Sequence, residues 1–344
     1  MIHNCTVDSI DSDFFVELIN QYDPHQILLI VDENTMQFVE RIHQITDYRI
    51  DAIQLPAGEE FKTINTVAGI WSDMTQNNFR RNGLVINLGG GVITDMGGFA
   101  AATFKRGVDF VNIPTTLLGM VDASIGGKTG VDYQDFKNQV GVIKDAVHVF
   151  CDIEFLKTLP ETELLSGFAE VIKHGLVRDK SYWLECTTGE YKSLDWQKVV
   201  LGSVRIKSEI VAKDPLEKGE RKLLNFGHTI GHAIESFYLE SGSPILHGNG
   251  VAVGMICESH ISFQQGLLSE VELQEVVGFI SAAYPKLDIV EENFDAFLVR
   301  MLNDKKNISD EINFTLLAEI GIGKVNCTAS KDQIVKALVF YQSL

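Results

Sequence analysis

The sequence predicts an α/β protein with a Rossmann-like α/β domain over residues 1–159, followed by a mainly α-helical domain over residues 160–344. The first half contains short apolar runs separated by turn residues and helical stretches, as expected for buried parallel strands. Beyond about residue 160 the pattern changes to long helical segments. Pro160 favours a boundary here, because proline disfavours helix at the residue before it. A chain of 344 residues is long enough for two separate cores.

The apolar runs define the strands expected in the first domain, which are Ile27–Val31, Leu84–Leu88, Val108–Ile113 and Val147–Asp152. Their alternation with helical stretches indicates a parallel sheet. In the second domain, helices are expected at 163–178, 194–213, 226–240, 247–266 and 269–285. A short β pair is expected near Ile312–Leu317.

Composition and charge narrow the classes of partner. The chain is 45% hydrophobic and 22% charged, which is ordinary for a globular protein, and its net charge is −18. This charge argues against nucleic acid and against anionic membranes, because both are bound through basic surfaces. The five cysteines are widely separated and form no Cys-x-x-Cys pair, which favours reduced thiols. Residues 1–15 are acidic and no apolar run has membrane-spanning length, so a cytoplasmic location is expected.

Gly89–Gly91 is the first motif with chemical meaning. It follows an expected strand and precedes a helical stretch at Asp95–Thr103, so amides at the helix start could approach a pyrophosphate. The Gly-x-Gly-x-x-Gly spacing is absent, and three glycines form a structural turn about half the time. Asp32, Asn34 and the stretch Gly58–Lys62 could add ribose and adenine contacts, although each alone is typical of a surface turn.

A second dense block of hydroxyls, glycines and lysines includes Pro114–Leu118, Asp122–Gly130, Lys137 and Asn138. So many anion-binding groups in a short stretch resemble an anion cradle. Lys128 lies in a Gly-Gly-Lys-Thr sequence that is similar to the end of a P-loop. Asp122 stands where a P-loop needs its first glycine, so ATP hydrolysis is disfavoured.

Histidines and one glutamate indicate a metal site in the second half. His228 and His232 are four residues apart in an expected helix and share one face of it. His247 opens the next helix, and Glu170 lies in an earlier one. Two histidines and a carboxylate form a known catalytic zinc set, so the four candidates exceed what one ion needs, although a lone helical histidine is more often structural. Thr229 replaces the glutamate that a His-Glu-x-x-His peptidase needs, which disfavours peptide hydrolysis.

Cations near these elements suggest an anionic substrate. They are Arg106, Lys173, Lys207, Arg221 and the pair Lys305–Lys306. In so acidic a chain, cations beside glycines and candidate metal ligands favour a small molecule that bears phosphate and carboxylate. Each alone is more often part of a solvated surface.

Eight motifs occur in one order along the chain: Gly89–Asp95, Pro114–Leu118, Gly126–Thr129, Lys137–Asn138, Ala169–Lys173, Arg221–Glu235, His247–Gly248 and Asp304–Lys306. This ordered set resembles the 3-dehydroquinate synthase family of the sugar-phosphate cyclases, from about residue 27 to residue 325. The resemblance implies a nucleotide-binding domain followed by a metal- and substrate-binding domain, with the active site in the cleft between them.

The resemblance also assigns roles to residues. It implies Glu170, His228 and His247 as metal ligands, with His232 near the substrate phosphate or in proton transfer. The implied NAD contacts are Asp32, Asn34, Gly58, Glu59, Lys62, Gly90, Gly91, Val92, Ile93, Thr94, Asp95, Thr115, Thr116, Lys128, Lys137, Phe155, Leu156, Lys157 and Thr158. The implied substrate contacts are Arg106, Asp122, Lys128, Asn138, Lys173, Lys207, Arg221, Asn225, His232 and Lys306, with Lys305 an alternative to the last.

The family's reaction converts 3-deoxy-D-arabino-heptulosonate 7-phosphate to 3-dehydroquinate and phosphate. It implies NAD, one divalent metal (zinc or cobalt), transient oxidation at C4, β-elimination of phosphate, reduction and an intramolecular aldol step. The counterpart of Arg106 reaches a neighbouring subunit's site in the family, which implies a homodimer.

Some positions depart from the family pattern: Thr94 for the usual Gly, Asp132 for Asn, Asn249 for Glu, and Glu161–Glu163 without the usual Arg. Two alternatives remain. One is a sister cyclase that makes valiolones or deoxyinososes, which the retained cations disfavour. The other is a metal-dependent polyol or alcohol dehydrogenase, which typically has Asp at position 170.

Overall fold

The computed structural model describes residues 4–134, 136–302 and 312–344. The chain packs as two compact units, Met1–Pro160 with Trp196–Ser208, and Glu161–Asp195 with Glu209–Leu344. The first unit's long segment ends within one residue of the expected boundary. Residues 196–208 differ from the expectation, because they group with the first unit. Two contacts explain this: Lys207 Nζ donates to Asp122 Oδ1 at 2.6 Å, and Gln197 Nε2 donates to the Val7 carbonyl at 3.5 Å.

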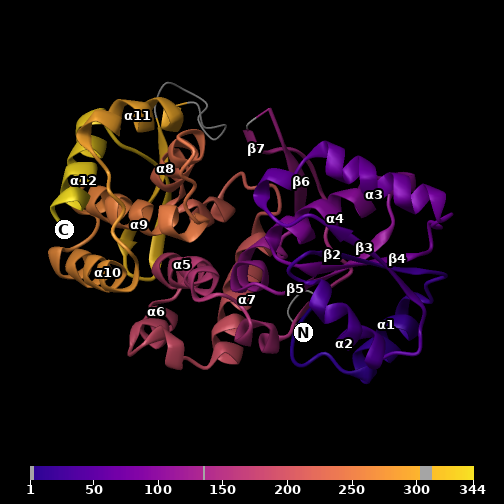
Figure 1. The fold of residues 1–344 in the computed structure, drawn as a ribbon. Helices are drawn as coiled ribbons and strands as arrows, with labels where there is room; N and C mark the ends of the chain where they lie inside the picture. Colours follow the sequence, from indigo (N-terminus) through magenta and orange to yellow (C-terminus); the bar gives the residue numbers. More distant parts are fainter. Residues whose placement is uncertain (1–3, 135, 303–311) are drawn as a thin grey trace. The chain divides into compact units, whose positions relative to one another are not determined.

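The first unit is built on a six-stranded parallel sheet with the order β1-β8-β5-β4-β2-β3 (Figure 1). Its strands are β1 (Cys5–Val7), β2 (Ile27–Asp32), β3 (Ile50–Leu55), β4 (Leu84–Gly89), β5 (Asp109–Pro114) and β8 (His148–Cys151). The four expected strands and the α/β class are confirmed. The two edge strands, β1 and β3, were not predicted. In β3 only Ile50 and Leu55 are buried, so it lacks the continuous apolar run of a central strand.

Helices cover both faces of this sheet. Figure 1 shows α1 (Ser12–Tyr22) and α2 (Val39–Gln44) on one side, with α3 (Ile64–Gln76) and α4 (Gly91–Thr103) on the other. α4 begins four residues before the expected Asp95, directly after β4. It lies against the sheet so closely that a Cβ on Gly97 would be 1.9 Å from Asn87 Oδ1.

Shorter elements complete the first unit. β6 (Lys128–Tyr133) and β7 (Phe136–Ile143) form an antiparallel pair. The helical turns are η1 (Met36–Phe38), η2 (Glu59–Phe61), η3 (Phe104–Arg106), η4 (Gly119–Ala123) and η5 (Ile153–Lys157). Within the block that the sequence suggested as an anion cradle, Lys128–Gly130 lie in β6, and Lys137 and Asn138 lie in β7.

The second unit is mainly helical, as expected. Its helices are α5 (Glu161–Arg178), α6 (Lys180–Thr187), α8 (His228–Glu240), α9 (His247–Gln264), α10 (Glu270–Ala283), α11 (Phe294–Leu302) and α12 (Lys331–Ser343), with turns η6 (Tyr191–Ser193), η7 (Glu220–Asn225) and η8 (Glu291–Asn293). The helix α7 (Trp196–Lys213) begins in the first unit's residues and ends in the second's. The expected β pair is confirmed as β9 (Asn313–Glu319) with β10 (Ile322–Thr328).

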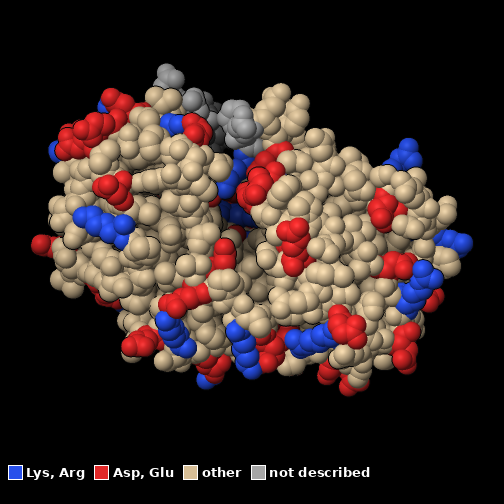
Figure 2. Space-filling view, viewed as in Figure 1, with Lys and Arg blue, Asp and Glu red and all other residues tan. Residues whose placement is uncertain are grey.

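Many charged side chains lie on the surface, and the cysteines are buried inside the protein. On the face drawn in Figure 2, acidic and basic side chains of the described residues are interspersed over the surface. All five cysteines are buried free thiols. In the described part of the chain, no helix is both long enough and apolar enough to cross a membrane.

Candidate active site

The candidate nucleotide site lies at the carboxyl edge of the parallel sheet. From β2 the chain moves outward to β3 and then returns to the other side of β2 to form β4. The carboxyl ends of β2 and β4 therefore flank a topological switch point, where ligands of open α/β sheets bind. Asp32 ends β2, Gly90 and Gly91 follow β4, and Thr115 follows the adjacent β5. The topology thus brings together candidates that are far apart in sequence.

The glycine loop after β4 leads directly into the first turn of α4. Gly90 is the N-cap and, among the described residues, no side chain caps this helix. A Cβ on Gly90 would be 3.0 Å from Thr116 Cγ2, so the loop packs tightly. Thr115 N–H donates to the Gly89 carbonyl at 3.0 Å and Thr94 Oγ1 to the Gly91 carbonyl at 3.1 Å. Thr94 is therefore accommodated inside α4, and the helix start offers backbone amides to an anion.

Lys62 connects the nucleotide loop to the β6/β7 pair. Its buried Nζ lies 2.7 Å from Asp95 Oδ2 and 2.7 Å from Asn138 Oδ1. Burial alone would lower the pKa of Lys62, but Asp95 and Glu59 outweigh it and raise that pKa. Burial raises the pKa of Asp95, while Lys62 opposes the shift. Lys62 therefore serves side chains of both candidate sets.

The amide of Asn138 has a defined orientation. Lys62 is only a donor, so the atom that faces it is the Asn138 oxygen and the amide NH₂ points elsewhere. Asn138 has φ = 51°, in the left-handed region, and its backbone N–H donates to Asp132 Oδ1 at 2.6 Å. Asp132, one of the departures from the family pattern, thus supports a strained residue. The remaining NH₂ group is suited to bind an anion.

Other nucleotide candidates have local structural partners. The carboxylate of Asp32 accepts the N–H groups of Asn34 and Thr35, and Asn34 itself is exposed. Phe155 and Leu156 are buried, whereas Lys157 is exposed and pairs with Glu154 at 2.7 Å. The remaining nucleotide candidates lie close to these residues or to the glycine loop. Gly58 and Glu59 follow β3, Val92 and Ile93 lie in α4, Thr116 follows Thr115, Lys137 is 4.0 Å from Glu59, and Thr158 follows η5.

The candidate metal ligands come from three helices. Glu170 lies in α5, His228 opens α8 and His247 opens α9. Glu170 Oε1 lies 3.3 Å from His228 Nε2 and 3.5 Å from His247 Nε2, and Oε2 contacts Lys173 Nζ. His228 Nδ1 lies 3.1 Å from the Phe226 carbonyl, and His247 Nδ1 lies 3.2 Å from Glu235 Oε2. These partners are acceptors, so each Nδ1 carries a proton and each ring turns its Nε2 toward Glu170.

This arrangement fits a divalent cation. Glu170 Oε1 is buried and has no hydrogen-bond partner among the described residues. Three candidate ligand atoms converge, and the 3.3 and 3.5 Å from Glu170 Oε1 to the two Nε2 atoms are close to the roughly 3.3 Å expected for tetrahedral ligands about 2.0–2.2 Å from zinc. Glu235 on His247 matches the carboxylate–histidine pairing that orients metal-binding imidazoles.

Burial and neighbouring charges shift the pKa values of the candidate metal ligands. Burial would raise the pKa of Glu170, but Lys173 and His228 outweigh it and hold that pKa well below its usual value. Burial lowers the pKa of His228, and Lys173 adds to the effect. Burial would also lower the pKa of His247, but the nearby carboxylates of Glu170 and Glu235 raise it to about 10. The Glu170 carboxylate is thus ionised where a cation would bind.

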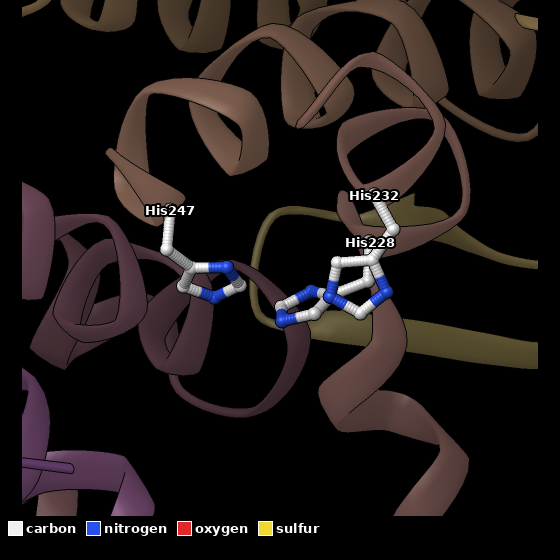
Figure 3. A group of neighbouring side chains, drawn as sticks. All are labelled: His228, His232 and His247. Carbon is white, nitrogen blue, oxygen red and sulfur yellow. The ribbon is translucent and has the colours of Figure 1, made fainter. Parts of the chain in front are cut away.

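His232 belongs to the same cluster (Figure 3). Its ring centroid lies 4.9 Å from that of His228 and 5.7 Å from that of His247. One ring nitrogen from each of the three histidines lies within 4.8 Å of the others. The geometry brings all four candidate ligands together, and the choice of three among them remains a prediction.

The candidate substrate cations differ in their surroundings. Lys173 and Lys207 are buried and paired with Glu170 and Asp122, respectively. Arg221 is buried and donates from Nη1 to the Pro215 carbonyl at 2.8 Å. Among the others, Asn225 Nδ2 donates to Glu217 at 2.7 Å, Lys128 is exposed at the start of β6, and Lys305 and Lys306 lie outside the described residues.

Arg106 lies in a strained segment. Lys105, Arg106 and Gly107 have φ values of 47°, 64° and 115°. Two consecutive non-glycine residues in this region are strained, which is a feature of functional positions. Arg106 is exposed and borders a cavity of about 410 Å³ that Arg81 and Lys144 also line.

The close contact between α8 and α9 was not predicted from the sequence. Gly227 and Gly231 face Gly250 and Gly254, and a Cβ on Gly254 would be only 1.8 Å from the Gly227 carbonyl oxygen. The two helices therefore touch through their backbones, next to His228. The Gly-x-x-x-Gly spacing on both helices was the available sequence signal.

The chain is similar to known proteins over most of its length. Residues 52–166 match the N-terminal domain of 3-dehydroquinate synthase and residues 167–307 match its C-terminal domain. A 3-dehydroquinate synthase of Parabacteroides distasonis is 40% identical over 94% of this chain and 92% of its own length.

Solved structures show the same fold. A 2-epi-5-epi-valiolone synthase from Streptomyces hygroscopicus with NAD⁺ and Zn²⁺ bound aligns at TM-score 0.85 and 25% identity, over 100% of this chain and 97% of that one. A 2-deoxy-scyllo-inosose synthase complexed with carbaglucose-6-phosphate, NAD⁺ and Co²⁺ aligns at TM-score 0.84 and 22% identity, over 97% and 95%. With family matches that cover most of its length, the chain belongs to the 3-dehydroquinate synthase family.

Proposed function

We propose that this protein converts 3-deoxy-D-arabino-heptulosonate 7-phosphate to 3-dehydroquinate and phosphate, using NAD and one divalent metal. The observation that carries the proposal is the buried, unpartnered Glu170 Oε1 that faces His228 Nε2 and His247 Nε2. When bound, NAD supplies reversible hydride acceptance and the ion supplies Lewis acidity toward a substrate hydroxyl. Zinc and cobalt both suit a Glu-His-His set.

The first unit would bind the nucleotide and the substrate phosphate. The uncapped start of α4 would offer amides to the pyrophosphate, and Asn138, whose Oδ1 accepts from Lys62, would donate from its NH₂ group to the departing phosphate. Lys128, at the start of β6, would add positive charge. Lys207, held by Asp122, would orient a substrate hydroxyl.

The second unit would hold the metal and the substrate carboxylate. Glu170, His228 and His247 would be the ligands, and His232 would face the phosphate or move a proton. Lys173 would balance the charge of Glu170 and reach the substrate beside it. Arg221 would pair with the carboxylate through its planar guanidinium, together with Lys306, and Asn225 would help to hold the phosphate.

We further propose a homodimer in which Arg106 serves the partner's site. The strained backbone of Lys105, Arg106 and Gly107, which exposes the Arg106 side chain, supports this proposal. Arg106→Ala should then raise the KM for the sugar phosphate and leave the KM for NAD unchanged. Equal values for wild type and variant would remove Arg106 from the site.

The proposed reaction belongs to the shikimate pathway of aromatic amino acid biosynthesis, and we place the enzyme in the cytoplasm. Buried free thiols are compatible with that reducing compartment.

The test is an assay of phosphate release and dehydroquinate formation from the heptulosonate phosphate, with and without a chelator. Turnover should require metal and produce no net NADH, because the cofactor is regenerated in each cycle. Glu170→Ala should remain folded and contain no metal by elemental analysis. Net NADH from a polyol would indicate a dehydrogenase, and turnover of another sugar phosphate alone would indicate a sister cyclase. No turnover by metal-loaded protein would refute the proposal.

A further inference from the structure

Glu258 is a buried carboxylate in α9 that the proposed chemistry does not use. We propose that Glu258 is a positioning residue for the metal centre, because it caps the start of α8 from the neighbouring helix and thereby fixes His228. The inference rests on the metal-dependent function proposed above.

The start of α8 needs acceptors from elsewhere. The first amides of a helix have no partner within the helix, and a side chain at the N-cap usually satisfies one of them. Here the N-cap is Gly227, with φ = 80° and no side chain. Glu258 replaces the missing cap: its Oε2 accepts the Gly227 N–H at 2.6 Å and its Oε1 accepts the Ile230 N–H at 3.2 Å.

This bidentate contact encloses His228. The two clamped amides belong to the residue before His228 and to the residue two positions after it. The negative charge of Glu258 is also favourable at the positive end of the α8 dipole. Because both carboxylate oxygens bind backbone, the clamp restrains both the translation and the tilt of the first turn. The Phe226 carbonyl that orients the His228 ring adjoins the same turn.

The clamp acts where small displacements matter. Metal sites need ligand distances within about 0.2 Å of their preferred values. Gly227 and Gly231 already place α8 in backbone contact with α9, which carries His247. Glu258 extends this contact by one helical turn, from Gly254 to position 258. One face of α9 thereby sets the position of a ligand on α8 relative to a ligand on α9.

A simple stabilising cap must be distinguished from a positioning residue. Ser269 offers the matched control, because it caps α10 in the same unit through a capping box with Glu272. Ser269→Ala removes a helix cap at a helix without candidate metal ligands, at a cost of about 0.5–2 kcal/mol. Glu258→Gln keeps the size of the side chain and one acceptor, but turns an NH₂ group toward a backbone N–H. Glu258→Ala removes both acceptors.

The experiment measures zinc and cobalt dissociation constants of the full-length apo-protein by competition with a chelator. The visible spectrum of the cobalt form reports ligand geometry. Relative to wild type, Glu258→Gln and Glu258→Ala should raise the dissociation constants about 10–100-fold, the usual effect of losing an outer support of a metal ligand. Both should also change the cobalt spectrum. Ser269→Ala should lower Tm but leave affinity and spectrum unchanged.

Wild-type affinity and spectrum in both Glu258 variants would overturn the inference, as would an equal loss of affinity in Ser269→Ala. Failure of the wild-type protein to bind either metal would instead refute the proposed function itself. Far-UV circular dichroism confirms that each variant is folded, and Glu258→Gln is the variant designed to keep the fold.

Discussion

The substitution Gly254→Ala tests whether the contact between α8 and α9 holds the metal ligands. A Cβ at position 254 would lie 1.8 Å from the Gly227 carbonyl oxygen and 2.9 Å from the Gly231 nitrogen. Contacts below 3.0 Å are essentially never observed for a real Cβ, so the helices must separate by roughly 1 Å. The atoms that the new Cβ would meet all belong to the backbone of Gly227 and Gly231, so no side chain can rotate away to relieve the clash.

The magnitude follows from two opposing effects. Overpacking against backbone should cost about 3 kcal/mol, the upper end of the usual range, while replacing a helical glycine by alanine returns about 1 kcal/mol. The net loss of about 2 kcal/mol corresponds to a fall in Tm of about 4–8 °C for a unit of this size. A shift of roughly 1 Å also exceeds the tolerance of about 0.2 Å for metal ligands, so zinc affinity should fall tenfold or more.

Gly278→Ala is the matched control. Gly278 lies in α10, is exposed, and has no atom within 4 Å of the position that a Cβ would occupy. The variant should gain about 1 kcal/mol of helix propensity, raise Tm by about 2–4 °C and bind zinc as wild type does. Thermal unfolding of the apo-proteins and chelator-competition titrations give both quantities. A Gly254→Ala protein with wild-type zinc affinity would refute the argument that this contact positions the ligands.

Three further predictions concern the individual sites. Lys173→Met leaves Glu170 without its buried partner, so the apo-protein should lose about 3–5 kcal/mol of stability. The zinc-loaded protein should lose less, because the bound cation compensates the negative charge of Glu170. Equal falls in Tm with and without zinc would contradict this prediction. Asp132→Ala should raise the KM for the sugar phosphate about tenfold, because the hydrogen bond to the Asn138 backbone is lost, and should leave the KM for NAD unchanged. Asp132→Asn should retain most of the affinity for the sugar phosphate. Equal changes in the two KM values would argue against a phosphate-specific role. Dialysis against a chelator should stop phosphate release, and added zinc or cobalt should restore it. The circular dichroism spectrum should stay native, because Lys173 continues to balance the charge of Glu170. Activity that survives complete metal removal would refute metal dependence.

The parallel sheet was predictable where its strands are buried on both faces. β2, β4, β5 and β8 appear in the sequence as apolar runs. The edge strand β3 could not be recognised in this way, because polar Asp51 and Gln54 at exposed positions interrupt its apolar residues. The β6/β7 pair was also missed, since its glycines resemble those of a phosphate loop. In the structure, Gly130 and Gly141 instead allow close approach of the strands, because a Cβ on Gly141 would be 2.2 Å from the Thr129 carbonyl oxygen.

The candidate site was predictable as residue types, but its supporting contacts were not. Glu170, His228 and His247 stand out because two histidines and a carboxylate form a known metal-ligand set. Their distances depend on how α5, α8 and α9 pack, and the sequence carries no direct measure of that packing. The contact of Lys62 with Asn138 spans 76 positions, and that of Glu258 with Gly227 spans 31. A single carboxylate within the apolar run of α9 was the one available signal for Glu258.

The positions of glycine and histidine in α8 and α9 explain how close packing and metal binding coexist. In α8 each of His228 and His232 directly follows a glycine, so the histidine pair is rotated by about 100° from the glycine pair around the helix axis. One face can therefore touch α9 while the adjacent face presents the imidazoles. In α9, His247, Gly250, Gly254 and Glu258 follow at intervals of three, four and four residues, which places them on one face. The same face thus supplies a candidate ligand, the contact with α8 and the cap of α8, so a change in the packing of this pair alters the distance between His228 and His247.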